Sequence, residues 1–269
     1  MRRVSSRALL AGAALTVAAS LVHADDTRRE IQKYQRMTAE SSPVELWEME
    51  GADLWKQKRG PNNVSLERCD LGMGPGVLKG AYAHLPRYFK DTGRVQDLES
   101  RLVTCMTTLQ GFSEQEATKR VFGNADKPSD MEYLAAYVAG KSRGVKMQVG
   151  TKDPKEKAAY EMGKALFFYR AGPWDFSCAS CHGHEGKRIR MQELPVLSSP
   201  KGARGTYTTW PGYRVSVSQL KTMQWRLNDC FRQQRFPEPK YASDATIALT
   251  MYMAVNANGA TYRGPGTKR

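Results

Sequence analysis

The chain lacks long apolar segments beyond its N-terminus, and it has few acidic residues. After residue 22, no apolar run approaches the roughly 20 residues that a membrane-spanning helix needs, so we expect no span in the remaining chain. Only 27 aspartates and glutamates face 41 lysines and arginines among 269 residues, which gives a formal net charge of +14. This shortage of acids favours anionic partners or substrates, including acidic proteins and small oxyanions.

The N-terminal segment has the composition of an export signal. Three arginines precede an apolar and small-residue run over residues 8–22, and an A-x-A-like cleavage site ends at Ala24. We therefore predict a signal peptide over residues 1–24, a mature chain that begins at Asp25, and a periplasmic location. A retained membrane anchor is the alternative, which the shortness of the run disfavours. Removal of the signal lowers the formal charge by three, from +14 to +11.

The pentapeptide Cys178-Ala179-Ser180-Cys181-His182 is the attachment signature of a c-type haem. Two thiols at this spacing add across the two vinyl groups of one porphyrin, and the following histidine reaches the iron as proximal ligand. A disulfide between the two cysteines, or half of a zinc site with His184 as a further ligand, is the alternative. The predicted export signal favours haem attachment over these alternatives, because c-type haem is attached outside the cytoplasm. For an exported haem protein, nucleic acid is the least fitting anionic partner, and we expect none.

The sequence contains an internal repeat. Residues 51–61 align without gaps on residues 163–173, and both follow the pattern G-x-x-L-aromatic-x-x-basic-x-G-P. Three further features recur in the same order. They are a cysteine (Cys69 and Cys178), an R-L-x-x-C motif (101–105 and 226–230) and an apolar stretch expected to be helical (131–140 and 245–256). The repeat predicts a mainly α fold with two tandem cytochrome c-like domains, residues 25–150 and 151–269.

The first copy lacks the residues that hold a haem. Its pentapeptide reads Cys69-Asp70-Leu71-Gly72-Met73, without the second cysteine and without the histidine. We therefore expect one covalently bound haem c per chain, in the C-terminal domain, and none in the N-terminal domain. Cys69 and Cys105 are then two thiols in an oxidising compartment, which favours a disulfide between them over two separately buried thiols. His84 is a further candidate ligand, although a surface histidine is the simpler interpretation.

One cysteine of the five is left over, Cys230. An odd cysteine in an exported protein indicates an intermolecular bond or a reactive thiol. Cys230 lies 52 residues after Cys178, which is where c-type cytochromes place the distal ligand, so we predict that it is the sixth iron ligand. The competing candidates are Met191, Met223, Met251, Met253 and His184. A methionine on a helix more often packs in the core.

The residues around Cys230 are strongly basic. Arg226 precedes it by one turn on a helix expected over residues 217–232, and Arg232 and Arg235 follow it. We expect a thiolate of low pKa beside an anion-binding arginine. A solvated basic face is the alternative, and it suits Arg232 better than Arg226. A thiolate ligand lowers the haem potential, which disfavours simple electron shuttling and favours chemistry at the sulfur.

The haem motif, the duplicated architecture and residues 228–239, Asn-Asp-Cys-Phe-Arg-Gln-Gln-Arg-Phe-Pro-Glu-Pro, resemble the SoxA subunits of SoxAX cytochromes. These are the L-cysteine S-thiosulfotransferases of sulfur oxidation. Some members carry haem in both domains, whereas Gly72 and Met73 make this sequence similar to the single-haem type. The resemblance implies that Cys230 is both iron ligand and catalytic residue, carried as a persulfide, and that Arg226 binds thiosulfate.

The same resemblance implies partners. They are a SoxX-like cytochrome subunit in a heterodimer, a SoxYZ-like carrier protein whose cysteine takes the thiosulfonate group, and a small acceptor cytochrome c. The residues leave two other functions open, a plain electron-transfer cytochrome and a structural haem subunit.

Overall fold

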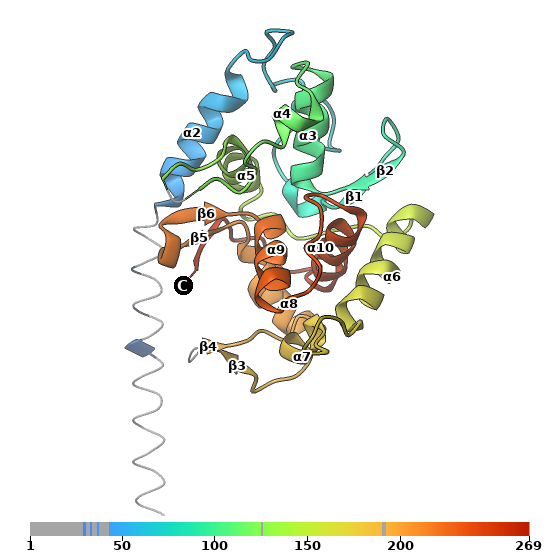
Figure 1. The fold of residues 1–269 in the computed structure, drawn as a ribbon. Coiled ribbons are helices and arrows are strands. Elements are labelled where there is room, and N and C mark those ends of the chain that lie inside the picture. Colours follow the sequence, from blue (N-terminus) through green and yellow to red (C-terminus); the bar gives the residue numbers. More distant parts are fainter. Residues whose placement is uncertain are drawn as a thin grey trace, which may run out of the picture. The chain divides into compact units, whose positions relative to one another are not determined.

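The computed structural model describes residues 29, 30, 33, 37, 43–124, 126–189 and 192–268 (Figure 1). The chain divides into two units, Met1–Ser42 and Pro43–Arg269, and the fold given below is that of the second. The predicted signal peptide lies outside the described residues. No helix within the described ranges is long and apolar enough to cross a membrane.

The second unit is mainly helical, as the repeat predicts. Its helices are α2 (Val44–Lys56), α3 (Leu98–Thr108), α4 (Glu114–Ala117), α5 (Asp130–Gly140), α6 (Pro154–Phe168), α7 (Cys178–His182), α8 (Pro200–Thr206), α9 (Met223–Gln233) and α10 (Asp244–Asn256), with single 3-10 turns η1 (Tyr82–His84), η2 (Tyr207–Thr209) and η3 (Val215–Val217). Its short strands are β1 (Arg87–Phe89), β2 (Arg94–Gln96), β3 (Arg188–Ile189), β4 (Gln192–Glu193), β5 (Gly212–Arg214), β6 (Gln219–Lys221) and β7 (Gly266–Lys268). The helices expected over 131–140 and 245–256 are confirmed as α5 and α10.

Each copy of the repeat contains a pair of packed helices. Helix α2 packs on α5 in the first copy, and α6 packs on α10 in the second. Equivalent glycines allow the close approach: a Cβ on Gly51 would lie 2.1 Å from the Tyr133 carbonyl oxygen, and one on Gly163 would lie 1.9 Å from that of Ala248. The sequence match between 51–61 and 163–173 therefore marks the same helix contact in both copies.

A hairpin followed by a helix also recurs in each copy. Strand β1 pairs antiparallel with β2, and β5 with β6. The register is the same, because Phe89 faces Arg94 in the first hairpin and Arg214 faces Gln219 in the second. Each residue of the first hairpin corresponds to the residue numbered 125 higher in the second, as Phe89 does to Arg214 and Arg94 to Gln219.

The same offset continues into the helices that follow. The side chain of Asp97 caps α3 and that of Thr222 caps α9, and the R-L-x-x-C motif then falls at the same place in both helices. The helix expected over residues 217–232 therefore begins later than predicted, at Met223. The reason is that residues 219–221 pair with β5 as a strand, and Thr222 accepts a hydrogen bond from the Trp225 amide, which starts the helix there.

The two copies share one core. Strand β7, at the end of the chain, pairs in parallel with β5, so the second sheet has the order β6-β5-β7. An isolated bridge joins Lys146, near the end of the first copy, to Thr261 of the second, and buried apolar residues of both copies belong to the same cluster. Because of these contacts Pro43–Arg269 is one compact unit, and the domain boundary between residues 150 and 151 stays a prediction from the repeat.

Candidate functional site

Helix α7 presents the haem-attachment motif from one short turn. Ser177 caps this helix, since its hydroxyl accepts from the Ser180 amide at 3.1 Å while the Ser180 hydroxyl accepts from the Ser177 amide at 3.0 Å. Cys178 and Cys181 are free thiols, so the disulfide alternative is not formed. Burial, with a further contribution from Cys230, raises the pKa of Cys178 to about 12.

His182 has the geometry of a histidine that offers one ring nitrogen to a metal. Its Nδ1 lies 2.9 Å from the Pro195 carbonyl oxygen, which accepts only, so Nδ1 carries the proton and the lone pair is on Nε2. Burial lowers the pKa of His182 and Arg226 lowers it further, against the Pro195 hydrogen bond, so the neutral imidazole is favoured. A neutral imidazole fixed through Nδ1, on the residue after two free thiols, fits the proximal ligand of a c-type haem.

Cys230, on α9, is close enough to this motif to interact electrostatically with its cysteines. Its charge interacts with those of Cys178 and Cys181 from α7, and with those of Arg226, Asp229 and Arg214. The structure thus brings the predicted sixth ligand to the attachment motif. The expected low thiol pKa is wrong for the free thiol, because burial raises the pKa of Cys230 by more than Arg226 lowers it.

Arg226 is held by a carboxylate that the sequence analysis did not consider. Its Nη1 donates to Oδ2 of Asp229 at 3.0 Å, and Arg232 and Gln233 donate to the same carboxylate at 2.7 Å each. The Arg226 side chain is 26% exposed and that of Arg232 is 62% exposed. Arg226 is therefore the sheltered guanidinium and Arg232 the solvated one. The i,i+3 spacing of Arg226 and Asp229 was the signal that could have revealed this pair.

A second arginine near Cys230, Arg214, was also missed by the sequence analysis. It lies on β5, its guanidinium carbon is 5.9 Å from the Trp225 ring centroid, and it interacts electrostatically with Arg226 and Cys230. The sequence interval between Arg214 and Cys230 spans a hairpin, so no helical spacing links the two residues. Arg235, by contrast, lies over Trp174, with its guanidinium carbon 5.3 Å from the ring centroid.

The competing ligands lie elsewhere or are packed in the core. Met223, Met251 and Met253 are 6%, 0% and 4% exposed within the apolar core, while His184 is exposed. Met191 lies outside the described residues. His84, on η1, has its Nδ1 3.2 Å from the Gln148 carbonyl oxygen. Across the described ranges, no group of three or more His, Cys, Asp and Glu side chains is arranged to hold a metal ion, which includes the zinc site weighed for the Cys178 motif.

The first copy has a disulfide where the second has free thiols. Cys69 and Cys105, which are 0% and 3% exposed, are bonded with 5.6 Å between their Cα atoms. Asp70 accepts from the amides of Gly72 at 2.7 Å and Gly74 at 3.1 Å, so the eroded pentapeptide forms a turn where the second copy has α7. The pair of cysteines predicted to replace the haem is therefore joined.

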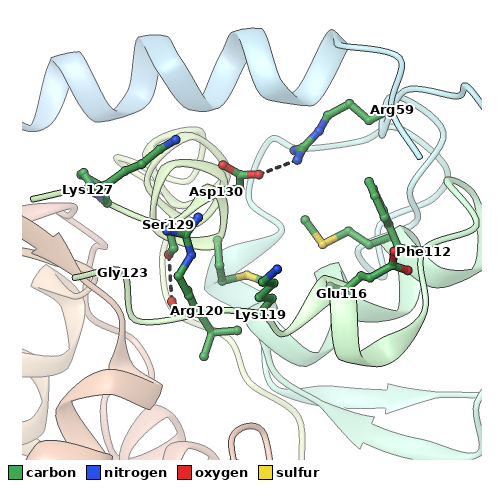
Figure 2. Close-up of a pocket in the computed structure, with 14 residues that line it drawn as sticks. Arg59, Phe112, Glu116, Lys119, Arg120, Gly123, Lys127, Ser129 and Asp130 are labelled. Atoms are coloured by element: carbon green, nitrogen blue, oxygen red, sulfur yellow. Dashed lines mark hydrogen bonds and ion pairs between the residues drawn. The ribbon is translucent and has the colours of Figure 1, made fainter. Parts of the chain in front are cut away.

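A cavity of about 200 Å³ lies in the first copy (Figure 2). Residues of α4, of the following loop and of the start of α5 line it, and at its edge Arg59 pairs with Asp130 at 2.5 Å. None of the predicted haem, thiol or substrate residues belongs to its lining. The candidate site is thus the surroundings of Cys230 and not this cavity.

Residues 50–147 and 162–262 match a family model described as the SoxA/TsdA cytochrome c domain. The chain belongs to the SoxA/TsdA cytochrome c family. The two matched segments coincide with the two copies of the repeat, which confirms two cytochrome c-like domains. Membership in this family also supports c-type haem as the cofactor, consistent with the donor set on α7.

Curated SoxA proteins are similar over nearly their whole length. The "L-cysteine S-thiosulfotransferase subunit SoxA" of Hydrogenophilus thermoluteolus is 52% identical over 272 residues, covering 100% of this chain and 99% of that protein. The SoxA of Hydrogenobacter thermophilus is 35% identical, covering 93% and 92%. Among solved structures, the crystal structure of SoxXA from P. pantotrophus superposes with a TM-score of 0.72 at 27% identity, covering 88% of this chain and 84% of the other.

Proposed function

We propose that this SoxA/TsdA family member is the haem subunit of an L-cysteine S-thiosulfotransferase. It conjugates thiosulfate oxidatively to a cysteine of a carrier protein and passes the electrons through haem to a partner cytochrome. The observation that best supports the proposal is the placement of a free, half-buried thiol, Cys230, beside the attachment motif, with the sheltered guanidinium of Arg226 next to it. The names of the curated relatives support the same reaction.

The residues of the site have distinct roles in this proposal, and Cys230 has two. Cys178 and Cys181 would hold the haem covalently, and His182 Nε2 and Cys230 Sγ would ligate its iron. A haem bound there supplies a one-electron acceptor next to the sulfur and favours the thiolate over the buried thiol. Arg226 fixes the sulfonate oxygens of thiosulfate, because a planar guanidinium suits an oxyanion.

The chemistry at Cys230 is a two-step relay. In the first step the outer sulfur of thiosulfate forms an S–S bond with the sulfur carried on Cys230, as a thiolate or a persulfide, and two electrons leave. In the second step a thiolate of the carrier attacks the sulfur that bears the sulfonate, and the S–S bond to Cys230 breaks. Cys230 regains its original sulfur anion, and the carrier leaves as a thiosulfonate. This covalent relay replaces one difficult coupling with two simpler steps.

We propose the partners on the same basis. They are a SoxX-like cytochrome in a heterodimer, a SoxYZ-like carrier and a small acceptor cytochrome c, in the periplasm. The similarity to a SoxXA complex supports the first of these. The strong surplus of basic residues suits an acidic carrier and an anionic substrate.

The mature chain is expected to carry a single haem. In the first copy Cys69 and Cys105 form a disulfide and the pentapeptide has no histidine, so this copy offers no site for haem attachment. Intact mass spectrometry should show one covalent haem with two fewer hydrogens for the disulfide, and the same spectrum reports any additional sulfur on Cys230. A mass with two haems, or alkylation of Cys69 without prior reduction, would contradict this stoichiometry.

Replacing Arg226 with alanine is expected to lower kcat/KM for thiosulfate roughly ten- to hundredfold while leaving the haem in place. The reason is that a charge-assisted hydrogen bond to an oxyanion typically contributes about 1.5–3 kcal/mol. Arg226→Lys should recover part of the loss, because it restores the charge without the fork. The measurement is steady-state reduction of the acceptor cytochrome with partner and carrier present. Arg232→Ala removes a largely solvated charge from the same helix and is expected to cost much less.

A further inference from the structure

The two copies of the hairpin and helix allow a comparison around the equivalent arginines, Arg101 and Arg226. The alignment has no gaps from residue 85 to 105 and from 210 to 230, and strand register and helix caps agree. It places Arg214 of the second copy where the first has Phe89. The copy with the disulfide thus shows how an arginine at this place behaves when it is purely structural.

In the first copy, Arg101 is fully neutralised and buried. Its guanidinium carbon lies 4.0 Å from the centroid of the Phe89 ring. Its Nε donates to the Asp70 carbonyl at 2.6 Å, and its Nη1 donates to the carboxylate of Asp91 at 2.7 Å. The side chain is 6% exposed. Phe89, Asp91 and the Gln96 side-chain oxygen, all from the hairpin, therefore satisfy this arginine together with the Asp70 carbonyl and without any ligand.

In the second copy the aromatic ring and the aspartate are both replaced. Arg214 replaces the aromatic ring, and Ser216 stands at the position of Asp91, so a cation is gained at the first of these two positions and an anion is lost at the second. Arg226 has instead one carboxylate, Asp229, from its own helix, and the largely exposed Arg232 shares that carboxylate. The region next to Cys230 is left with more positive than negative charge.

Arg214 has donor capacity that no described residue uses. Its Nε is buried and has no hydrogen-bond partner in the part of the chain that the structure describes. A buried donor without an acceptor costs free energy, and the positive charge of Arg226 disfavours a second positive charge on Arg214. The repulsion is evident at Arg214, whose pKa is lowered by burial first and by Arg226 second. An oxyanion between the two arginines would satisfy the donor and cancel the repulsion.

We propose that Arg214 is a second substrate-binding residue and forms, with Arg226, a clamp for the sulfonate group of thiosulfate beside Cys230. The inference rests on the proposed function. A sulfonate has three oxygens, so one can accept from the Arg226 fork while another accepts from Arg214. Two cations at this place also offset the repulsion between the thiosulfate dianion and the sulfur anion on Cys230, which must approach each other for the S–S bond to form.

The first copy provides the test variant, Arg214→Phe. Phenylalanine at this hairpin position is known to fit against an arginine of the following helix, because Phe89 and Arg101 do so. Thiosulfate binding is measured by calorimetric titration of the reduced holo-complex with its partner subunit, which cannot take up the two electrons of the first step, and KM and kcat are measured with the carrier. Arg214→Lys tests for charge alone. Arg204→Gln is the matched control, since it also removes one arginine of the second copy. Arg204 is exposed, and its Nε donates to the Asn258 carbonyl.

We expect Arg214→Phe to weaken thiosulfate binding and raise KM by roughly ten- to hundredfold, with Arg214→Lys in between and Arg204→Gln near wild type. Unchanged thiosulfate affinity in Arg214→Phe would overturn the inference, and a shifted potential with unchanged affinity would assign Arg214 to the carboxylates of the haem instead. In both cases a wild-type complex that turns over leaves the proposed function intact, whereas a wild-type complex that binds no thiosulfate removes that function itself.

Discussion

Cys230→Ala is expected to abolish thiosulfate-dependent reduction of the acceptor cytochrome. The sulfur of this residue forms and breaks both S–S bonds in the proposed relay. The other cysteines that the structure describes are committed elsewhere, since Cys69 and Cys105 are bonded to each other and Cys178 and Cys181 belong to the haem motif. No neighbouring side chain can therefore carry the sulfonate-bearing sulfur. The loss should be complete to the limit of a steady-state assay with partner and carrier present.

The control must separate iron ligation from sulfur chemistry. Cys230→Met keeps a sulfur ligand within reach of the iron but offers no thiolate, so the variant should retain its covalent haem and show a raised haem potential. It should be as inactive as Cys230→Ala. Intact mass and redox titration check the haem, and the assay checks turnover. Activity that survives in either variant would overturn the thiosulfotransferase proposal and leave an electron-transfer cytochrome, and an unchanged thiolate electron-resonance signal in Cys230→Met would show that another residue ligates the iron.

The features that the sequence predicted well are local ones. The spacing of the pentapeptide fixes three donors on one turn of helix whatever surrounds it, and α7 presents them in this way. The apolar stretches at 131–140 and 245–256 form helices because each can bury its surface against the other helix of its pair. The R-L-x-x-C match correctly identified equivalent positions in α3 and α9. The common register of the two hairpins shows that the equivalence of the copies continues into the preceding strands.

The Arg226–Asp229 pair that was missed is local, but the other missed features depend on contacts between distant segments. Local charge suggested a low pKa for Cys230, but burial by packed neighbours raises it, and burial cannot be read from adjacent arginines. Arg214 was missed because it differs from its counterpart, Phe89, and a search for repeats finds what the copies share. A hairpin, and not helical spacing, brings Arg214 to Arg226. The helix start at Met223 likewise depended on the pairing of β6 with β5.

The contact between the two copies includes a buried ion pair, Lys221 with Glu132. Lys221 Nζ, from β6, donates to Glu132 Oε1 at 2.6 Å, to the Phe122 carbonyl at 2.8 Å and to Gln219 Oε1 at 2.7 Å. The two side chains are 5% and 0% exposed. All three ammonium protons therefore have acceptors, while the other oxygen of Glu132 caps α5 by accepting from the Ser129 amide at 2.9 Å. Removal of the lysine would leave a carboxylate buried without its cation.

Lys221→Met is accordingly expected to lower the free energy of unfolding by about 3–5 kcal/mol, because breaking one side of a buried ion pair leaves an uncompensated charge. For a unit of this size that corresponds to a fall in Tm of roughly 10 °C, measured by circular dichroism and by the haem absorbance of the holo-chain. Lys221→Met combined with Glu132→Gln should recover more than half of the loss, since the amide keeps an acceptor for Ser129 and carries no charge.

Arg94→Gln is the control: the Arg94–Asp244 pair also joins the two copies, but its side chains are 59% and 75% exposed, so its loss should cost less than about 1 kcal/mol. Equal stability of the single and double Lys221 variants would show that the charge of Glu132 is not what destabilises the fold, and that the loss comes from the hydrogen bonds to Phe122 and Gln219.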